Sequence, residues 1–222
     1  MCPFHIKGNL KMTILFLLSI VLFITIPTGR IYTSAFPVYQ STFSKEEMKS
    51  VFPKNLFTID NSCSDAQLKN IEVQYKLIPH HIIESMINDE FEIIVQTEDI
   101  KSQYDFDVIG LSVWDEKEIY IDARSQFNNF TLIHEIGHYV DRGLADNFTT
   151  SSKTMFSSNS DEFQTAYKKE KQKIKSEYGE YYGSNEKEFF AAIFTQIILE
   201  NKDIQNIAPE SCVFVKKIID IY

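Results

Sequence analysis

The chain is built around residues 131–141, which read Thr-Leu-Ile-His-Glu-Ile-Gly-His-Tyr-Val-Asp. His134 and His138 stand four residues apart, and at 3.6 residues per turn both lie on one face of a helix. Their imidazoles can together hold one Zn²⁺ at about 2.0–2.1 Å each. Glu135 reaches toward the metal without binding it, which is the position of a general base that takes a proton from a metal-held water. The pattern predicts a catalytic zinc site; a core helix with two hydrogen-bonded histidines and a surface Glu is the alternative.

The residues around this motif favour a buried helix over about 127–141. Gly137 has no side chain and lets another backbone come close. Asp141 lies seven residues after His134 on the same helical face, so it is a candidate acceptor for a ligand His N–H. An ordinary acid at a helix end is the alternative for Asp141. The apolar neighbours are Leu132, Ile133, Ile136 and Val140.

A catalytic zinc needs three protein ligands and an open position for water. No histidine follows His138, and the position six residues after it is Leu144, so a third downstream His is excluded. His80 and His81 lie far upstream beside Pro79, where they are more typical of a surface or a helix start than of a ligand. A carboxylate after the motif is therefore the expected third ligand.

The best place for this carboxylate is residues 185–194, Asn-Glu-Lys-Glu-Phe-Phe-Ala-Ala-Ile-Phe. This stretch predicts an apolar helix with two acids in its first turn and Asn185 as its cap. Both acids could simply complement the helix dipole. Glu188 directly precedes the apolar run and is expected to face the interior, whereas Glu186 is expected to face water. On the residues alone, the choice of Glu188 as ligand stays open.

The N-terminus has the form of a secretory signal peptide. Lys7 and Lys11 precede an apolar run over residues 13–27, and small residues follow at 33–35. We therefore expect cleavage after Ala35 and a secreted, extracellular protein with no further membrane contact. An uncleaved membrane anchor is the alternative, because the apolar run falls just short of a comfortable membrane span.

The charge of the mature chain limits its partners. Removing residues 1–35 leaves 19 basic against 31 acidic side chains, a formal charge of −12. Nucleic acids and anionic membranes require basic footprints, so neither is an expected partner. We expect a monomer that acts on polypeptides. The excess of acidic side chains favours neutral or cationic polypeptides as partners, although a need for solubility would by itself explain this excess.

Only Cys63 and Cys212 remain after the signal peptide. They could form a disulfide outside the cell, or they could be two free buried thiols. Neither belongs to a Cys-x-x-Cys or Cys-His pattern, so a cysteine zinc site and a thiol protease find no support.

Residues 36–222 predict one α+β domain, mostly helical, with a small β-sheet just before the zinc-binding helix. Residues 36–62 are rich in Pro, Ser and Thr and suggest a loose N-terminal segment with a short helix near 44–51. Hydrophobic periodicity predicts strands at 91–96, 108–114 and 118–122. An extended substrate could add as a strand to the edge offered by residues 108–122. Further helices are expected at 64–77, 80–88, 161–176, 186–199 and 210–221, with loops at 142–159 and 178–183.

Residues 134–141, His-Glu-Ile-Gly-His-Tyr-Val-Asp, are followed about fifty residues later by Tyr-Tyr-Gly-Ser-Asn-Glu-Lys-Glu-Phe-Phe-Ala-Ala-Ile-Phe at 181–194. Together these blocks resemble the anthrax lethal factor and Pro-Pro endopeptidase family of secreted zinc metalloproteases. The resemblance covers roughly residues 90–222 and implies a zincin-like domain, one catalytic Zn²⁺ and a proline-rich polypeptide substrate. The shortness of the chain and its own signal peptide make it more similar to the small Pro-Pro endopeptidases than to the multidomain toxin.

The resemblance also assigns residues. In the family, the Glu before Phe-Phe-Ala is the third zinc ligand, which here is Glu188, and a Tyr seven residues earlier assists catalysis, which here is Tyr181. Tyr178 and Tyr182 crowd the same loop, and Tyr182 is the main rival because a Gly follows it directly. The family usually continues Phe-Phe-Ala-Glu, whereas this chain has Ala192. In the family, the Glu at the position of Ala192 is not a metal ligand. Its replacement therefore leaves the predicted ligand set intact and affects only a contact beside the ligands.

The expected function is therefore a secreted zinc endopeptidase of the His-Glu-x-x-His type. The alternative is a secreted toxin-like or accessory zinc-binding protein with little proteolytic activity. Glu135 argues against the alternative, because a purely structural zinc site has no need of a base at that position.

Overall fold

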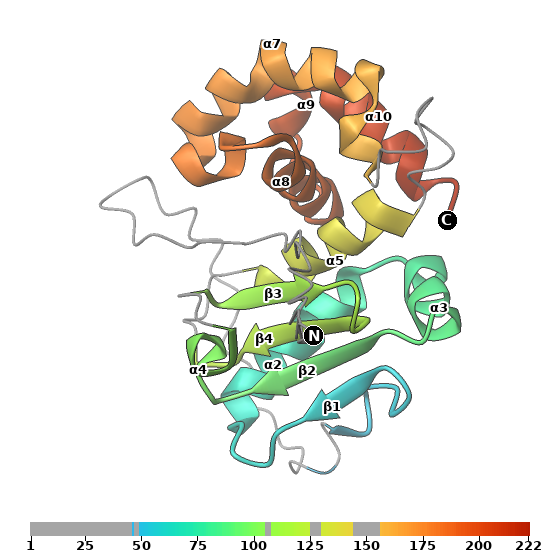
Figure 1. The fold of residues 1–222 in the computed structure, drawn as a ribbon, viewed down its shortest axis with the longest axis vertical. Coiled ribbons are helices and arrows are strands. Elements are labelled where there is room, and N and C mark those ends of the chain that lie inside the picture. The colour runs from blue at the N-terminus through green and yellow to red at the C-terminus, as the bar shows by residue number, and fades with distance from the viewer. Residues whose placement is uncertain (1–45, 47–48, 105–107, 125–129, 144–155) are drawn as a thin grey trace, which may run out of the picture.

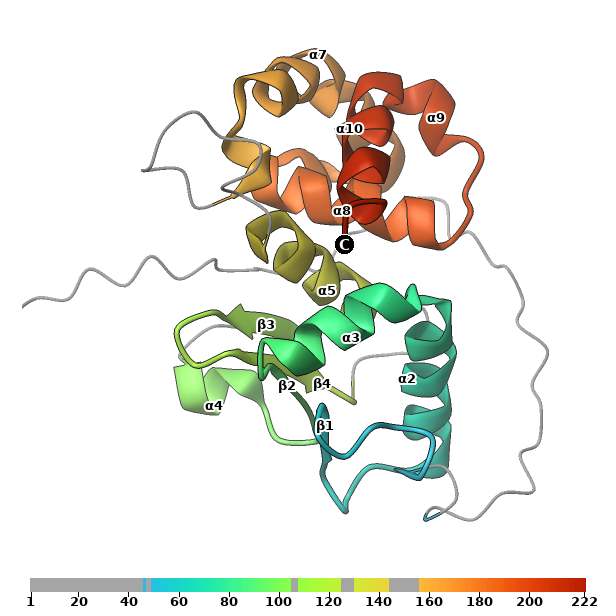
Figure 2. The same cartoon turned by 90° about the vertical axis from the view of Figure 1, so that its right-hand side faces the viewer.

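The computed structural model describes residues 46, 49–104, 108–124, 130–143 and 156–222. The predicted signal peptide and most of the helix predicted near 44–51 lie outside these residues. The described part is mostly helical with one four-stranded sheet, which confirms the predicted α+β class. In Figure 1 the sheet and helices α2–α4 form the lower half, helices α7–α10 form the upper half, and α5 lies between them. The turned view in Figure 2 shows the same arrangement.

The sheet has the strand order β1-β2-β4-β3. Strands β1 and β2 pair in parallel, as do β2 and β4, whereas β3 and β4 form an antiparallel hairpin. The turn between β3 and β4 is closed at Lys117, whose φ of 56° is left-handed. Among the described strands β3 lies at the edge, next to α5. The strands are β1 (Phe57–Ile59), β2 (Glu92–Gln96), β3 (Gly110–Val113) and β4 (Glu118–Asp122).

The alternation of side chains along the strands separates two apolar clusters. Ile119 and Ile121 of β4 point into the main core, and Tyr120 between them points into a smaller cluster on the opposite face. On β3, Leu111 and Val113 belong to this smaller cluster. The alternate residues of β3, at positions 110 and 112, therefore face α5, and this orientation matters for the site.

Strand β1 lies within the segment that the sequence suggested would be loose. Its Phe57 is buried and packs its ring against Phe52, with centroids 4.9 Å apart, and against Tyr75 at 5.4 Å. This aromatic contact holds the end of the segment on the sheet, so residues 52–59 belong to the folded domain.

The lower half contains three helices on the two faces of the sheet. Helix α2 begins with a capping box, in which Ser64 and Gln67 bond each other's backbone N–H groups. It ends before Pro79, as predicted. The short α4 was not predicted, and its Ile100 packs into the smaller cluster. These helices are α2 (Asp65–Leu77), α3 (His80–Asn88) and α4 (Ile100–Tyr104).

The upper half is a group of helices packed around α8. Buried Glu170 of α7 joins two of them, because its carboxylate accepts hydrogen bonds from the backbone N–H groups of Glu210 and Ser211 at the start of α10. These N–H groups have no partner within their own helix, so Glu170 replaces an N-cap. The helices are α7 (Asp161–Tyr178), α8 (Glu186–Ile198), α9 (Ile204–Ile207) and α10 (Pro209–Ile219), with 3₁₀ turns η1 (Ser157–Asn159) and η2 (Glu180–Gly183).

Helix α5 (Thr131–Gly143) carries the His-Glu-x-x-His motif and is buried from Thr131 to Asp141. The predicted close approach at Gly137 is confirmed, because a Cβ atom there would lie 3.0 Å from the Cα of Ala191 in α8. At the start of α5, the backbone N–H of Leu132 donates to the side-chain oxygen of Gln74, which lies on α2, at 3.0 Å. Contacts from both halves of the domain thus fix α5.

Cys63 and Cys212 are both buried, and no disulfide joins them. The Cys63 thiol donates to the carbonyl of Val95 at 3.7 Å, and the Cys212 thiol donates to that of Ile204 at 3.5 Å. The sequence left open whether Cys63 and Cys212 form a disulfide or remain buried thiols, and the structure shows buried thiols.

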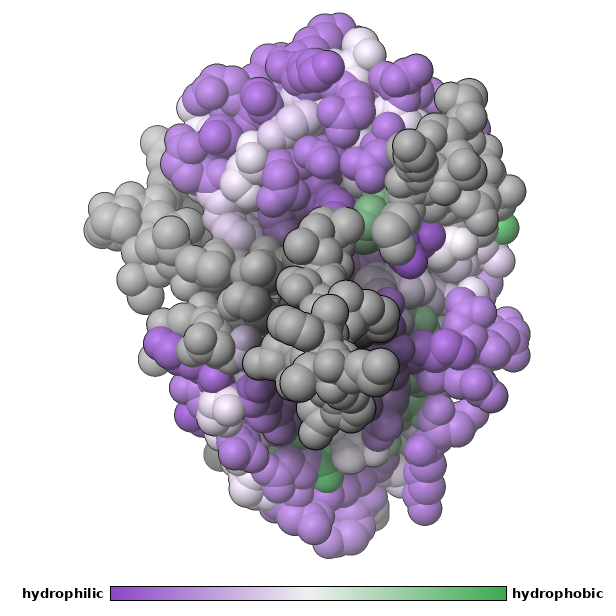
Figure 3. Space-filling model, in the orientation of Figure 1, coloured by the Kyte–Doolittle hydropathy of each residue, from purple (hydrophilic) through white to green (hydrophobic). Residues whose placement is uncertain are grey.

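No helix in the described ranges has the length and apolar character needed to cross a membrane. On the face shown in Figure 3, hydrophilic side chains cover most of the coloured surface and the hydrophobic ones form only small patches.

Candidate metal centre

Three predicted ligands meet between α5 and α8. Nε2 of His134 lies 3.1 Å from Oε2 of Glu188, and Nε2 of His138 lies 3.5 Å from the same oxygen. The two imidazole rings stand edge to face, with centroids 4.9 Å apart. All three side chains are buried, at 3%, 1% and 2% exposure respectively. Segments some fifty residues apart in sequence therefore supply one compact cluster.

Local structure at the start of α8 explains why Glu188 turns inward. The side chain of Asn185 accepts hydrogen bonds from the backbone N–H groups of Lys187 and Glu188, both at 3.0 Å, and so caps the helix. Glu186 takes another direction, and its carboxylate accepts a hydrogen bond from the side chain of Asn159 at 3.2 Å. Of the two acids in the first turn, the structure brings only Glu188 to the histidines.

The cluster fits a divalent metal ion. Ligands about 2.0–2.2 Å from one tetrahedral ion lie roughly 3.4 Å from each other, and the distances from Glu188 to the two histidines are 3.1 and 3.5 Å. Both ring nitrogens of His138 are buried without a hydrogen-bond partner in the described part of the chain. Such orphaned atoms are costly unless something else satisfies them. Two imidazoles and one carboxylate form the donor set of catalytic zinc sites.

The charges within the cluster support each other. Burial opposes the charged form of His138, but the Glu188 carboxylate outweighs it and raises the pKa of His138 to about 9. Burial likewise opposes ionisation of Glu188, but the charges of His138 and His134 and the hydrogen bond to His134 outweigh it and lower the pKa of Glu188. The carboxylate is thus ionised at neutral pH, as a metal ligand must be.

Glu135 lies beside the ligands and is completely buried. Its Oε2 accepts a hydrogen bond from the hydroxyl of Ser112 at 2.8 Å. Its Oε1 has no hydrogen-bond partner in the part of the chain that the structure describes. Burial raises the pKa of this carboxyl group. One oxygen is therefore held in place and the other is available to a proton donor, which is what a general base requires.

Strand β3 holds Glu135 through two residues that were not predicted as part of the site. Ser112 donates the hydrogen bond just described. At Gly110, a Cβ atom would lie 2.6 Å from Oε1 of Glu135 and 2.5 Å from Cγ2 of Thr131, so only glycine fits. The signal in the sequence was the pair of small residues at alternate positions of a predicted strand, which marks a face approached by another element.

We expect Ser112→Ala to lower kcat by about tenfold, because a hydrogen bond to a charged group contributes roughly 1.5–3 kcal/mol and the variant would free Glu135 to turn. Bound metal and melting temperature should stay close to those of the parent protein, and Ser112→Thr should recover part of the loss because it keeps the hydroxyl. An unchanged kcat in Ser112→Ala would show that packing alone fixes Glu135.

The tyrosines at the end of α7 and on η2, just before α8, point in different directions. The hydroxyl of Tyr181, on η2, donates a hydrogen bond to Oε2 of Glu188. Tyr182 packs its ring edge to face against His134, with centroids 6.0 Å apart. The hydroxyl of Tyr178 accepts a hydrogen bond from the side chain of Asn201 at 3.1 Å. Of these hydroxyls, the structure places that of Tyr181 at the ligand cluster.

The hydroxyl of Tyr181 is thus the expected oxyanion donor. We expect Tyr181→Phe to lower kcat roughly 10²-fold or more, with substrate affinity and metal content little changed. Tyr182→Phe should cost less than about tenfold by the same reasoning. Steady-state kinetics and metal analysis of both variants measure kcat, KM and bound zinc. Each variant loses one hydroxyl group, at one of two adjacent positions, so the pair shows which hydroxyl matters. An inactive Tyr182→Phe beside an active Tyr181→Phe would reverse the assignment.

Of the two predicted roles of Asp141, the structure does not show the hydrogen bond to a ligand histidine. Its carboxylate accepts hydrogen bonds from the backbone N–H and the hydroxyl of Ser158, both at 2.7 Å, rather than from a ligand histidine. Burial raises the pKa of Asp141 to about 7. The sequence placed Asp141 on the face of the ligands correctly, but it could not show that η1 would supply two closer donors. Asp141 therefore anchors η1 to α5.

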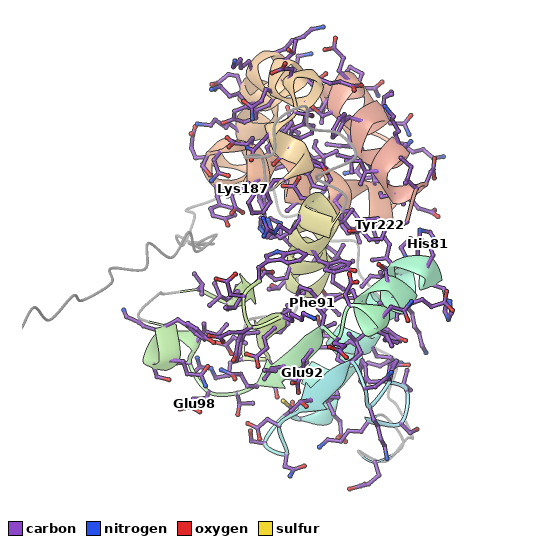
Figure 4. The ribbon with its side chains drawn as sticks, turned by 45° about the vertical axis from the view of Figure 1, so that its right-hand side comes forward. His81, Phe91, Glu92, Glu98, Lys187 and Tyr222 are labelled. Atoms are coloured by element: carbon purple, nitrogen blue, oxygen red, sulfur yellow. The ribbon has the colours of Figure 1, made fainter. Side chains whose placement is uncertain are left out.

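The upstream histidines lie away from the cluster, as predicted. A ring nitrogen of His81 is 3.0 Å from the carbonyl oxygen of Ile219 near the end of α10, and His80 lies 3.4 Å from Glu84 on its own helix. Figure 4 shows His81 on α3, well separated from Lys187 at the start of α8.

The chain is similar to known proteins in sequence and in fold. Residues 117–218 match the family described as anthrax toxin lethal factor, N- and C-terminal domain. A search of curated protein sequences finds no match. Among solved structures, the Pro-Pro endopeptidase PPEP-2 from Paenibacillus alvei is similar, with 17% identity and a TM-score of 0.55 over 73% of this chain and 96% of that chain. At this identity the likeness shows a shared fold. The family match over residues 117–218 and the shared fold confirm the predicted resemblance of this chain to the anthrax lethal factor and Pro-Pro endopeptidase family.

Proposed function

We propose that this protein is a secreted zinc-dependent endopeptidase that hydrolyses peptide bonds with a metal-activated water. The observation that carries the proposal is the buried cluster of His134, His138 and Glu188 with Glu135 beside it. One oxygen of Glu135 is hydrogen-bonded and the other has no partner among the described residues. A ligand set with an adjacent base is the arrangement of a hydrolytic metal site rather than of a structural one.

Each residue has a role in the proposed reaction. His134, His138 and Glu188 would hold the ion, which supplies a water of lowered pKa and polarises the scissile carbonyl when bound. Glu135 takes the proton of the attacking water and returns it to the nitrogen of the leaving amine. The hydroxyl of Tyr181 donates to the oxygen that becomes negative in the transition state. These steps conserve protons, because the one that the water loses is the one that the amine gains.

The proposed substrate class rests on the similarity to the solved relative. The solved relative is named as a Pro-Pro endopeptidase, so proline-rich polypeptides are the substrates to test first. The net charge of the full chain is −9, which supports a polypeptide substrate over nucleic acid. We also propose that the protein acts outside the cell, which rests on the predicted signal peptide at residues 1–35, and that it is a monomer.

Profiling the cleavage of a peptide library by the purified, zinc-loaded mature protein tests the function. We expect cleavage that stops when a chelator removes the metal and returns when Zn²⁺ is added. Cleavage between two prolines would support the finer specificity, and cleavage elsewhere would refute it. A metal-loaded protein that cleaves no peptide would favour the alternative of an accessory zinc-binding protein. Sequencing the N-terminus of the exported protein tests the signal peptide separately.

A further inference from the structure

We propose that Gln74 of α2 is a positioning residue for the metal centre, because its side chain replaces the N-cap of α5, the helix that carries both histidines and Glu135. This inference rests on the proposed peptidase function and adds to it a residue from a distant part of the chain. Gln74 acts through the backbone of α5 rather than on the reacting atoms.

The start of α5 has no cap of its own. The backbone N–H of His134 donates to the carbonyl of Phe130 at 2.9 Å, so Phe130 occupies the N-cap position. A Phe side chain has no oxygen that could accept from the N–H groups of the first turn. The hydroxyl of Thr131, the next residue, is buried without a hydrogen-bond partner in the described ranges. Thr131 and Leu132 are both buried, so an unpaired N–H group here would be costly.

Gln74 supplies the missing acceptor. Its Oε1 accepts the backbone N–H of Leu132, the second residue of α5, at 3.0 Å. An N-cap side chain usually accepts from this residue or from the one after it. Nε2 of Gln74 donates to Oδ1 of Asn70, one turn earlier on α2, at 2.6 Å. The side-chain amide is therefore held at both its oxygen and its nitrogen, and it is only 3% exposed.

The supporting helix belongs to the lower half of the domain. Figure 2 shows α2 at the side of this half, with the end that leads into α3 turned toward α5, and α2 and α5 are in contact. Gln74 lies near this end of α2. It reaches α5 from 58 residues away in the sequence, so the position of the cap is set by the packing of α2 on the domain.

The capped turn lies directly before the chemistry. Leu132 precedes His134 by two residues and Glu135 by three. Strand β3 packs against this turn, since a Cβ atom at Gly110 would lie 2.5 Å from Cγ2 of Thr131 and 2.6 Å from Oε1 of Glu135. A shift of the first turn against the strand would therefore also move the base. A displacement of about 1 Å can cost 10²-fold in rate.

Gln74→Met tests the cap, because Met has nearly the same size and lacks both hydrogen-bonding groups. We expect kcat at saturating zinc to fall about tenfold, with KM changed less than about twofold. Gln74→Glu keeps an acceptor oxygen, and a carboxylate is favoured near a helix N-terminus. It should therefore recover most of the lost kcat, which a loss of packing alone would not explain.

Ser64→Ala is the matched control. Its hydroxyl accepts from the backbone N–H of Gln67 and caps α2 itself, about 15 Å along the helix axis from Gln74. Both Ser64→Ala and Gln74→Met lose one helix cap and should melt at a lower temperature than wild type, but only Gln74→Met should lose activity. Lower melting temperatures in both variants with an unchanged kcat in both would show that Gln74 only stabilises the fold, which would overturn the proposal.

Asn70→Ala is a milder variant that keeps the proposal testable if Gln74→Met does not fold. It leaves the oxygen of Gln74 in place and removes the group that holds its nitrogen. We expect kcat to fall about threefold, because the cap becomes less well oriented. An unchanged kcat in Asn70→Ala, with Gln74→Met unfolded, would count against a positioning role.

Two measurements on the zinc-loaded protein need no turnover and separate this proposal from the proposed function. Amide hydrogen exchange over residues 131–135 should be about tenfold faster in Gln74→Met and as slow as wild type in Ser64→Ala. Zinc affinity should be about tenfold lower in Gln74→Met. These results would support the cap even if the wild-type protein cleaved no peptide. Unchanged exchange and unchanged kcat in Gln74→Met, beside normal cleavage by wild type, would refute the role of Gln74 and leave the peptidase function intact.

Discussion

Replacing Glu135 by Gln is expected to reduce kcat by about 10²- to 10⁴-fold, the range that a positioned general base supplies. The variant should keep its fold and its metal, because Gln has nearly the same shape and Glu135 is not part of the ligand set. Its side-chain oxygen can still accept the hydrogen bond from Ser112 that the structure shows at 2.8 Å. What it loses is the second oxygen, which has no partner among the described residues.

Steady-state kinetics, metal analysis and thermal unfolding of Glu135→Gln together check this expectation. Glu177→Gln, at an exposed position of α7, is the matched control and should behave as wild type. If Glu135→Gln were folded but had lost its metal, Glu135 would be a ligand and its assignment as base would be wrong. If the variant kept its activity, the proton would be taken by another group.

The ligand helix was the most predictable part of the site. Spacing alone places His134 and His138 on one face, and a helix that is apolar on its flanks has to be buried. The third ligand needed more, because Glu186 and Glu188 both occupy a helix first turn and spacing does not separate them. The structure separates them through the capping of α8 by Asn185, which fixes the direction of each side chain.

The partners of Glu135 and Asp141 could not be predicted in the same way. They depend on which strand or turn lies against α5, and that is long-range information. Ser112 reaches Glu135 from 23 residues away, and Ser158 reaches Asp141 from 17 residues away. Donors at such separations are chosen by tertiary packing, which local periodicity does not contain.

The same reasoning applies to the fold. The strands at 92–96, 110–113 and 118–122 were predicted because their apolar residues are continuous or alternate clearly. Strand β1 has three residues and helix α4 has five, which is too short for either period to be visible. Both owe their stability to what they contact: β1 pairs with β2, and α4 covers the smaller apolar cluster.

Removing the carboxylate of Glu188 should have the largest effect on the metal itself. We expect Glu188→Ala to lower Zn²⁺ affinity by more than about 100-fold, since even partners that only hold a ligand in place contribute 10- to 100-fold. The reason is geometric, because Glu188 is the carboxylate that the described part of the chain places against both histidines, at 3.1 and 3.5 Å. Glu186→Ala removes the same group two residues away and should bind Zn²⁺ as wild type does.

The melting temperature provides a measurement that does not depend on activity. A ligand that binds only the folded state stabilises it in proportion to the logarithm of its concentration over its Kd. Added Zn²⁺ should therefore raise the melting temperature of wild type and Glu186→Ala by similar amounts, and that of Glu188→Ala by much less. The metal-free melting temperatures show whether Glu188→Ala still folds. Equal zinc-induced shifts in the two variants would mean that two histidines suffice to bind the ion, and Glu188 would then be a hydrogen-bond partner of His134 rather than a ligand.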